Sequence, residues 1–209
     1  MTQTLGNMLT RIGSEINRTD IDSNIYDAVI SAIAFYEPYQ FYFNQATTTV
    51  TTTSDQRYTA ISGITDFVYP LSLRVTDSAS QYRLLEPMTF SEMEGRYLTD
   101  SSTGNIYYYS VFAERFYWWL IPNAAFTVTV NYIKSLTRPS GSTDTSYATA
   151  WMNDAEAMIR SKAKFYIYAD VLRNNDEAQK FEAISQREKQ ILDQKTTLRS
   201  YNSQMMGWI

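Results

Sequence analysis

Apolar residues at helical spacing predict a long helix over Trp151–Leu172. Apolar side chains recur every four positions from Trp151 to Ala163, and further apolar residues widen this line until most of the later surface is apolar. So wide an apolar face is typical of a buried helix. Ser146 or Asp154 is expected to cap its start, and Asn174-Asn175 is expected to end it.

A second helix of a different kind is predicted from Asp176 to Leu198. Polar and charged residues fill most of its surface, with acidic residues in its first turn and Arg199 at its end, as the helix dipole favours. One narrow apolar stripe runs along it, formed by Phe181, Ile184, Ile191 and Leu198. The short link to the preceding helix predicts an antiparallel pair.

The N-terminal part predicts another helix pair. Apolar residues at helical spacing run through Thr4–Ile16, and the polar segment 17–20 separates them from a second such pattern. Asp22 or Ser23 is expected to cap this second helix, and Pro38 to end it.

Between the helix pairs the period changes to that of strands. Ala46–Thr53 is rich in threonine, and apolar residues alternate with polar ones from Leu71 to Val75, with Gln81–Leu85 as the expected antiparallel partner. Thr89, followed at three residues by Glu92, has the pattern of a helix capping box.

A hairpin and one further strand are predicted after this short helix. The segments 105–112 and 115–121 are expected to form a hairpin that turns at Ala113-Glu114, and Phe126–Ile133 alternates as the next strand. No internal repeat is visible.

These elements predict an α+β fold that is mainly α. The expected architecture is a helical bundle formed by the N- and C-terminal helices, with a β-rich insertion and an extended C-terminal tail. The expected domains are an N-terminal helix pair (1–40), the β-rich insertion (41–145), a C-terminal helix pair (146–200) and a docking tail (201–209).

Composition excludes several kinds of chemistry. The 209 residues contain no cysteine and no histidine, which removes disulfides, thiolate zinc sites and every Ser-His or Cys-His nucleophile. The net charge of −4 does not favour strong binding to phosphate. No Gly-rich phosphate loop, metal-ligand spacing, signal peptide or membrane-spanning run is present, so we expect no cofactor, no metal and no membrane partner. Seventeen tyrosines and four tryptophans favour a protein that works through contact surfaces.

The order of these segments resembles the head-to-tail adaptor (connector) proteins of tailed phages, especially short-tailed phages. Four stretches carry the resemblance, and together they span nearly all of the chain: TLGNMLTRIGSEINRTDIDSNIYDAVISAIAFYE, FVYPLSLRV, IYYYSVFAERFYWWLIPNAAFTVTVNYIKS and WMNDAEAMIRSKAKFYIYADVLRNNDEAQKF. The similarity is one of element order, with no single signature motif.

The resemblance implies a non-enzymatic virion structural protein at the head-to-tail interface. Such adaptors form a ring, usually dodecameric, that binds the portal protein and joins it to a tail nozzle or tail-tube protein during tail assembly. Double-stranded DNA passes through the lumen in genome packaging and ejection, and the protein is made in the host cytoplasm. Some relatives are also described as hydrolysing peptidoglycan, but no residue motif here carries that activity over.

The C-terminal tail is the first candidate contact surface. Its large side chains are exposed apolar groups unless they pack back on the domain, and aromatic and methionine side chains are common interface anchors. We therefore expect Tyr201, Met205, Met206, Trp208 and Ile209 to dock on the portal or on another subunit.

The aromatic hairpin is the second candidate. An alternation of two places Tyr107 and Tyr109 on one face and Tyr108 on the other, so both faces are apolar and need a cover. We expect Tyr107, Tyr109, Trp118 and Trp119 to combine packing with subunit contact. A carbohydrate-binding module that stacks sugars on these rings is the alternative.

Carboxylates are the remaining catalytic candidates, and they define the alternative of a muramidase-like cell-wall hydrolase. Glycoside hydrolysis needs two carboxyl groups at a set separation. Neighbours two apart on a helix point in different directions, so neither Glu92 with Glu94 nor Asp154 with Glu156 forms such a pair, and a partner for Asp170 would come from elsewhere. We expect these acids to lie on solvated helix surfaces. We expect the cations interspersed with them to form ion pairs on helix surfaces; these are Arg160, Lys162, Lys164, Arg187, Lys189 and Lys195.

Overall fold

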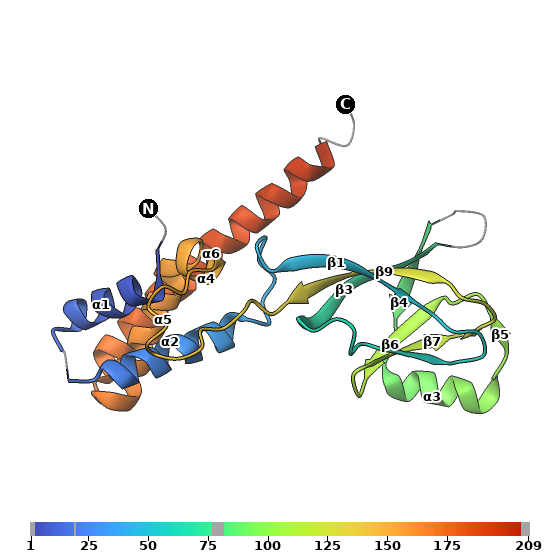
Figure 1. Ribbon diagram of the computed structural model, residues 1–209, viewed down its shortest axis with the longest axis horizontal. Coiled ribbons are helices and arrows are strands. Elements are labelled where there is room, and N and C mark those ends of the chain that lie inside the picture. Colours follow the sequence, from blue (N-terminus) through green and yellow to red (C-terminus); the bar gives the residue numbers. More distant parts are fainter. Residues whose placement is uncertain (1–2, 19, 77–81, 206–209) are drawn as a thin grey trace. The chain divides into compact units, whose positions relative to one another are not determined.

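The computed structural model describes residues 3–18, 20–76 and 82–205, with 200–205 as backbone alone. The chain divides into two compact units, which we call the helical unit and the β unit (Figure 1). The helical unit joins both ends of the chain, residues 1–44 and 136–209, and the β unit comprises residues 45–135. Each unit has its own buried core.

Helices that are distant in sequence pack together in the helical unit. Its described helical segments are α1 (Leu5–Ile16), α2 (Asp22–Tyr36), α4 (Ala150–Asn153), α5 (Glu156–Tyr166), the π-helix η1 (Ile167–Val171) and α6 (Asn175–Met205). The core contains the apolar side of α1 and α2 together with Trp151, which is fully buried and packs edge-to-face against the stacked rings of Phe41 and Phe43. α1 is the N-terminal helix that the spacing predicted, with the hydroxyl of Thr4 accepting a hydrogen bond from the Asn7 N–H.

Caps elsewhere in the helical unit differ from the prediction. The residue before α2 is Ile21, which makes no side-chain cap, so neither Asp22 nor Ser23 caps this helix. Thr149 precedes α4 in place of Ser146. The predicted break between the two C-terminal helices is confirmed, because η1 ends at Val171 and α6 begins at Asn175. The Asn174 side chain accepts a hydrogen bond from the Glu177 N–H at the start of α6.

The predicted helix over Trp151–Leu172 is three segments in place of one. The helix is interrupted at Asp154 and Ala155, where the Ala155 backbone leaves the helical region (φ −113°, ψ 12°). Beyond Tyr166 the chain continues as a π-helix, in which hydrogen bonds span five residues, as from Leu172 N–H to the Ile167 carbonyl. The apolar pattern identified the buried side of these segments but did not reveal their breaks.

α6 packs through a few buried positions and through the first half of its predicted apolar stripe, where the Phe181 ring stacks on Tyr168. Its buried positions are Ala178, Ser185, Leu192 and Thr196. The hydroxyls of Ser185 and Thr196 bond to carbonyls of the same helix, which leaves compact surfaces that let α6 lie close to its neighbours. Along the predicted stripe, Phe181 and Ile184 are half-buried, whereas Ile191 is 39% exposed and Leu198 is 63% exposed, so only its second half lies at the surface.

The β unit is built on one large mixed sheet that curls on itself (Figure 1). Seven strands follow the order β1-β9-β3-β4-β6-β7-β2, and a separate pair joins β5 and β8. The strands are β1 (Gln45–Thr51), β2 (Tyr58–Ala60), β3 (Phe67–Thr76), β4 (Tyr82–Pro87), β5 (Thr103–Gly104), β6 (Tyr108–Phe112), β7 (Arg115–Trp119), β8 (Ile121–Pro122) and β9 (Thr127–Lys134).

Most predicted strands are confirmed, and their pairing explains the alternation. β3 pairs with β4 in antiparallel fashion, and its buried residues Leu73 and Val75 alternate with exposed Arg74. β6 and β7 form the predicted hairpin, turning at Ala113 and Glu114, which both have positive φ (46° and 56°). β4 and β6 are parallel and pair only at two positions.

Long-range pairing organises the sheet around β9. This strand lies between β1 and β3, and it pairs with β1 in an unbroken register from Gln45↔Ile133 to Thr51↔Thr127. The helix α3 (Phe90–Thr99) begins with the predicted capping box of Thr89 and Glu92. Curling of the sheet encloses a core whose largest fully buried member is Trp118.

The predicted fold class was wrong. The protein is a mixed α/β structure, 43% helix and 25% strand, with a large curled sheet in place of a helical bundle carrying a small β insertion. The extent of the sheet was underestimated because several of its pairings, such as β1 with β9, join strands that lie far apart in the sequence. An extended tail is also wrong for 201–205, since α6 continues to Met205.

Candidate assembly surfaces

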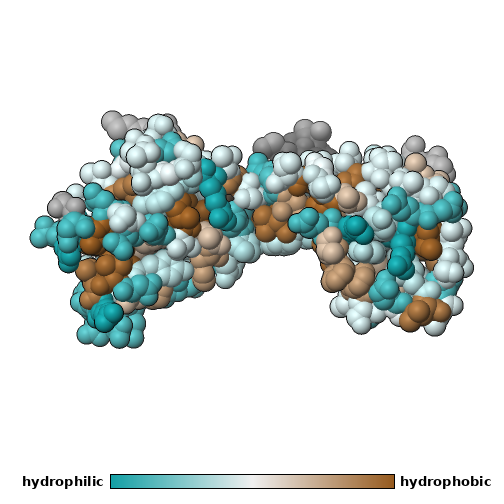
Figure 2. Space-filling view, turned by 60° about the horizontal axis from the view of Figure 1, so that its bottom comes forward, coloured by the Kyte–Doolittle hydropathy of each residue, from teal (hydrophilic) through white to brown (hydrophobic). Residues whose placement is uncertain are grey.

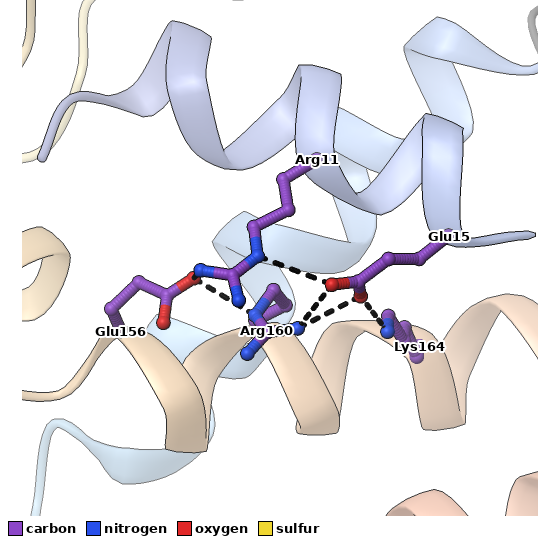
Figure 3. A network of polar contacts seen from close by, with 5 residues as sticks. All are labelled: Arg11, Glu15, Glu156, Arg160 and Lys164. Atoms are coloured by element: carbon purple, nitrogen blue, oxygen red, sulfur yellow. Dashed lines mark hydrogen bonds and ion pairs between the residues drawn. The ribbon is translucent and has the colours of Figure 1, made fainter.

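A network of five charged side chains, from exposed Arg11 to buried Lys164, joins α1 to α5 (Figure 3). The Glu15 carboxylate on α1 accepts hydrogen bonds from Arg160, at 2.6 and 2.8 Å from Nη1 to the two oxygens, and from the Lys164 ammonium. Arg11 Nε lies 3.1 Å from the same carboxylate, and Arg11 and Arg160 also contact Glu156. Five side chains thus connect the N-terminal helix to the interrupted helix of the C-terminal half.

The electrostatics of this network stabilise ionised Glu15. Partial burial by itself raises the pKa of Glu15, but the hydrogen bonds from Lys164 and Arg160 and their positive charges together lower it to about 2. Lys164 is only 6% exposed, so Glu15 compensates a cation that water scarcely reaches. The carboxylate therefore holds α1 against α5 and is not free for chemistry.

Lys162 makes the equivalent link between α5 and α6. Its ammonium lies 2.6 Å from Glu182 and 4.3 Å from the ring centroids of Phe35 and Phe165. Burial by itself raises the pKa of Glu182, but the hydrogen bonds from Lys162, Gln186 and Ser185 and the charge of Lys162 together lower it. The predicted ion pairing is confirmed for Arg160, Lys162 and Lys164, but most of it runs between helices, and only the pair of Arg160 with Glu156 lies along one helix.

The candidate carboxylates are engaged in the structure of the fold. Glu92 completes the capping box at Thr89, Glu94 lies 3.6 Å from Arg57, and Asp154 accepts a 2.5 Å hydrogen bond from the Tyr42 hydroxyl. Glu156 belongs to the charge network, and Asp170 is exposed at the end of η1. Within the described residues no group of three or more acidic side chains is placed to hold a metal ion.

The aromatic hairpin divides into a buried and an exposed half. Trp118 is fully buried, with its Nε1 donating to the Thr59 hydroxyl at 3.0 Å, and Tyr109 is 6% exposed. Tyr107 is 43% exposed and lies under the guanidinium of Arg83, while Trp119 is half-buried and lies under that of Arg96. Of the four predicted contact residues, Tyr107 and Trp119 therefore offer accessible ring surface.

Further exposed apolar groups in the β unit were not singled out from sequence. They are Tyr82, Leu84, Leu98, Val111 and Phe112, with exposures from 39% to 89%. Figure 2 shows hydrophobic areas that interrupt the polar surface of both units. The sequence did contain a signal for two of them, because alternation along β4 places Tyr82 and Leu84 on one side of the strand and Arg83 and Leu85 on the other.

The tail residues are described only in part. Tyr201 and Met205 belong to the backbone of α6, and Met206, Trp208 and Ile209 lie outside the described residues. Met205 continues the seven-residue spacing of the exposed side chains Ile191 and Leu198. Seven residues are close to two helical turns, so Met205 lies on the same side of α6 as this exposed stripe.

Comparison with known proteins identifies the family. The family model described as SU10 adaptor protein matches residues 3–206. The chain belongs to that family. No curated protein matches the adaptor. The resemblance to phage head-to-tail adaptors in the order of elements is thereby confirmed.

Membership in the family supports a phage adaptor role and a place in the virion. It also supports a structural rather than an enzymatic protein. In the part of the adaptor that the structure describes, no helix has the length and apolar character needed to cross a membrane.

Proposed function

We propose that the adaptor is a non-enzymatic ring component of a phage head-to-tail connector. The ring, with twelve subunits as the expected number, docks beneath the portal protein and joins it to a tail nozzle or tail-tube protein, and double-stranded DNA passes through its lumen. The family match over nearly the whole chain carries this proposal. Two separate units on one chain support it, since an adaptor needs surfaces for more than one partner.

Contacts on the portal are assigned to the end of α6. The exposed stripe of Ile191 and Leu198 supports this assignment, because apolar groups left at the surface of one subunit are stabilised when a partner covers them. Tyr201, Met205, Met206, Trp208 and Ile209 extend the same apolar character to the chain end. In a ring each such contact is repeated in every subunit, so a modest contact gives firm docking.

Light scattering coupled to size exclusion, with and without purified portal rings, tests the proposal. We expect the free adaptor to be monomeric or weakly associated and to form a defined multi-subunit complex with the portal. Electron micrographs of that complex then show whether a ring lies beneath the portal. Failure of the full-length adaptor to bind either the portal or itself contradicts the proposed function.

Deletion of residues 201–209 tests the assigned contact separately. We expect the shortened protein to keep its helical circular dichroism and to lose portal docking. Unchanged docking contradicts the role of the tail without contradicting the adaptor role. A zymogram on murein with the pure protein is the matching test of the cell-wall hydrolase alternative, and we expect no clearing.

A further inference from the structure

β1 has an open backbone edge. It is an end strand of the seven-stranded sheet, and the Thr52 N–H that follows it donates to the Phe126 carbonyl on the β9 side at 3.0 Å. Because backbone groups alternate along an antiparallel strand, Thr47, Thr49 and Thr51 direct theirs away from β9. No described residue accepts a hydrogen bond from these outward N–H groups.

The usual protections of an edge strand are absent from β1. Its seven residues, QATTTVT, include no charged side chain and no proline, and its register with β9 contains no bulge. Native proteins normally blunt such edges with charge, proline, bulges or short length, because an open edge recruits another strand. The opposite end of the sheet is blunted in this way, since β2 has only three residues and follows Arg57.

A second open edge lies on β4. The Glu86 N–H donates to the Tyr107 carbonyl on the β6 side at 3.0 Å, so the alternating residues Tyr82 and Leu84 also face that side. β6 pairs with β4 only at Glu86 and Pro87, and this leaves the first half of β4 with no strand of the described chain beside it. The two open edges bound opposite sides of the four strands β1-β9-β3-β4.

Side chains on the two edges belong to the same face of the sheet. The pairing aligns Thr49, Thr129, Arg74 and Leu84 in one row, and Thr51, Thr127, Thr76 and Tyr82 in the next. Tyr82 is 67% exposed and Leu84 is 66% exposed at one end of these rows, while exposed threonines form the other end. Aromatic and aliphatic side chains pair favourably with β-branched ones across strands.

The directions of the two edge strands also suit pairing between copies. β1, β9, β3 and β4 alternate, so β4 runs antiparallel to β1 within one chain. When the same sheet is repeated in a neighbouring copy, the β1 of that copy is therefore antiparallel to this β4. An interface between opposite edges is heterologous, and heterologous contacts close into a ring when the rotation from one copy to the next divides a full turn.

We infer that the β4 edge of one adaptor subunit pairs with the β1 edge of the next, so that the sheet continues from subunit to subunit. The row alignment places Leu84 beside Thr49 of the neighbouring copy, and Tyr82 beside its Thr51. Both members of each pair direct their backbone groups outward, as an antiparallel hydrogen-bonded pair requires. This inference rests on the ring proposed above and assigns the contact that closes it.

Cysteine cross-linking tests the pairing directly, because the chain has no native cysteine. Thr49→Cys and Leu84→Cys in one chain lie three strand spacings apart, about 14 Å, beyond the roughly 7 Å between Cα atoms that a disulfide spans. Any disulfide therefore joins two copies. When the protein with both substitutions is bound to the portal and mildly oxidised, we expect a series of cross-linked multimers on a non-reducing gel, with species larger than the dimer.

The single variants are the matched controls. A mixture of Thr49→Cys protein and Leu84→Cys protein is expected to give dimers only, and each variant alone is expected to give none. Dimers of Thr49→Cys protein alone would indicate β1-to-β1 pairing and overturn the heterologous arrangement.

Proline at the edge gives a second test. Thr49→Pro removes only an outward N–H, so the β1–β9 hydrogen bonds remain, whereas Thr49→Val keeps the N–H and the β-branched shape. In the proline variant, the hydrogen bond to the neighbouring subunit is lost and the pyrrolidine group clashes with that subunit's strand, so we expect assembly of the subunit ring to fall about tenfold. In the valine variant we expect little change. Thermal unfolding of both variants shows whether the fold is intact.

The outcomes separate the two proposals. Portal-bound rings that give no cross-link and that form equally well with Thr49→Pro overturn the edge pairing and leave the adaptor role standing. Absence of any assembly by the wild-type protein, with or without portal, overturns both. A ladder from the double variant together with slowed exchange of the Thr49 and Leu84 amides in the ring supports the inference.

Discussion

Positive side chains lie over aromatic rings in both units, but the helical unit and the β unit differ in how many of these cations also form ion pairs. In the helical unit, cations on α5 meet carboxylates on α1 and α6, and two of these cations, Lys162 and Lys164, are buried. All five arginines of the β unit lie over aromatic rings: Arg57 over Tyr97, Arg74 over Tyr82, Arg83 over Tyr107, Arg96 over Tyr108 and Trp119, and Arg115 over Tyr58. Among the described residues of the β unit, only Arg57 also makes an ion pair.

This difference separates two kinds of stabilisation. A carboxylate loses its charge in acid, so an ion pair is weakened there, whereas an arginine over a neutral ring keeps its interaction across the usual pH range. Ion pairs order helices whose contacts lie far apart in the sequence. Stacked arginines cover aromatic strands and keep their charge near the surface. The ion pairs of the helical unit are therefore expected to weaken in acid, and its Glu15 has a pKa lowered to about 2.

The largest expected effect comes from the buried tryptophans, which test whether the units unfold separately. Trp118→Ala removes the largest buried side chain of the β core and its hydrogen bond to Thr59, so we expect a loss of about 3–5 kcal/mol in unfolding free energy. Calorimetry is expected to show this shift in one of two transitions. Trp151→Ala, its counterpart in the helical core, is expected to shift the other. A single transition that moves with both variants would contradict two independent units.

Glu15→Gln is the next largest expected change, and it tests the charge network. The variant leaves Lys164 buried without its carboxylate, so we expect the helical transition to lose about 2–3 kcal/mol. Glu188→Gln is the matched control, because its partner Arg187 is 69% exposed and such surface pairs contribute about 0–1 kcal/mol. Equal effects of the two substitutions would show that the network adds nothing beyond a surface ion pair.

Acid unfolding gives a smaller effect in the same direction. The pKa of Glu15 in the folded protein is about 2 against an ordinary 4.5, so its contribution is present above pH 4.5 and is lost as the pH falls toward 2. We expect the helical transition to weaken by on the order of 1–2 kcal/mol over this range, after solvent screening of a side chain that is partly exposed. Thermal melts between pH 6 and pH 2.5 measure it. The same slope in Glu15→Gln protein would remove Glu15 as the cause.

Removing a helix cap is expected to have the smallest effect, and the comparison uses one cap from each unit. Thr89 caps α3 of the β unit reciprocally with Glu92, whereas Thr4 caps α1 with a single 3.3 Å bond. We expect Thr89→Ala to cost about 1 kcal/mol and Thr4→Ala about 0.5 kcal/mol. Chemical denaturation of each variant, with Thr→Ser at the same position as the control, checks this order.

Local features of the fold were predictable from the sequence, because they depend on neighbours along the chain. The spacing of Leu5, Met8 and Ile12 predicted α1, the alternation at Leu73 and Val75 predicted β3, and Thr89 with Glu92 predicted a cap. Each of these signals spans fewer than about fifteen residues, the range over which periodicity is informative.

Features that depend on distant neighbours were not predictable in this way. Nothing in the threonine-rich pattern of β1 shows that its partner is β9, or that seven short strands join in one sheet. Charged residues are usually solvated, which is why Lys162 and Lys164 were expected at the surface although they are buried with Glu182 and Glu15. Ile191 and Leu198 show the reverse error, since an apolar stripe identifies a contact face but not whether the same chain covers it.

The pairing of Gln45 with Ile133 has a consequence for how such adaptors diversify. The backbone passes into the strand-rich half and back out of it on two adjacent, hydrogen-bonded strands, about 5 Å apart. A few turn residues are enough to span that gap. The whole segment between these two positions can therefore be exchanged or shortened as one unit while the helical sequences stay as they are.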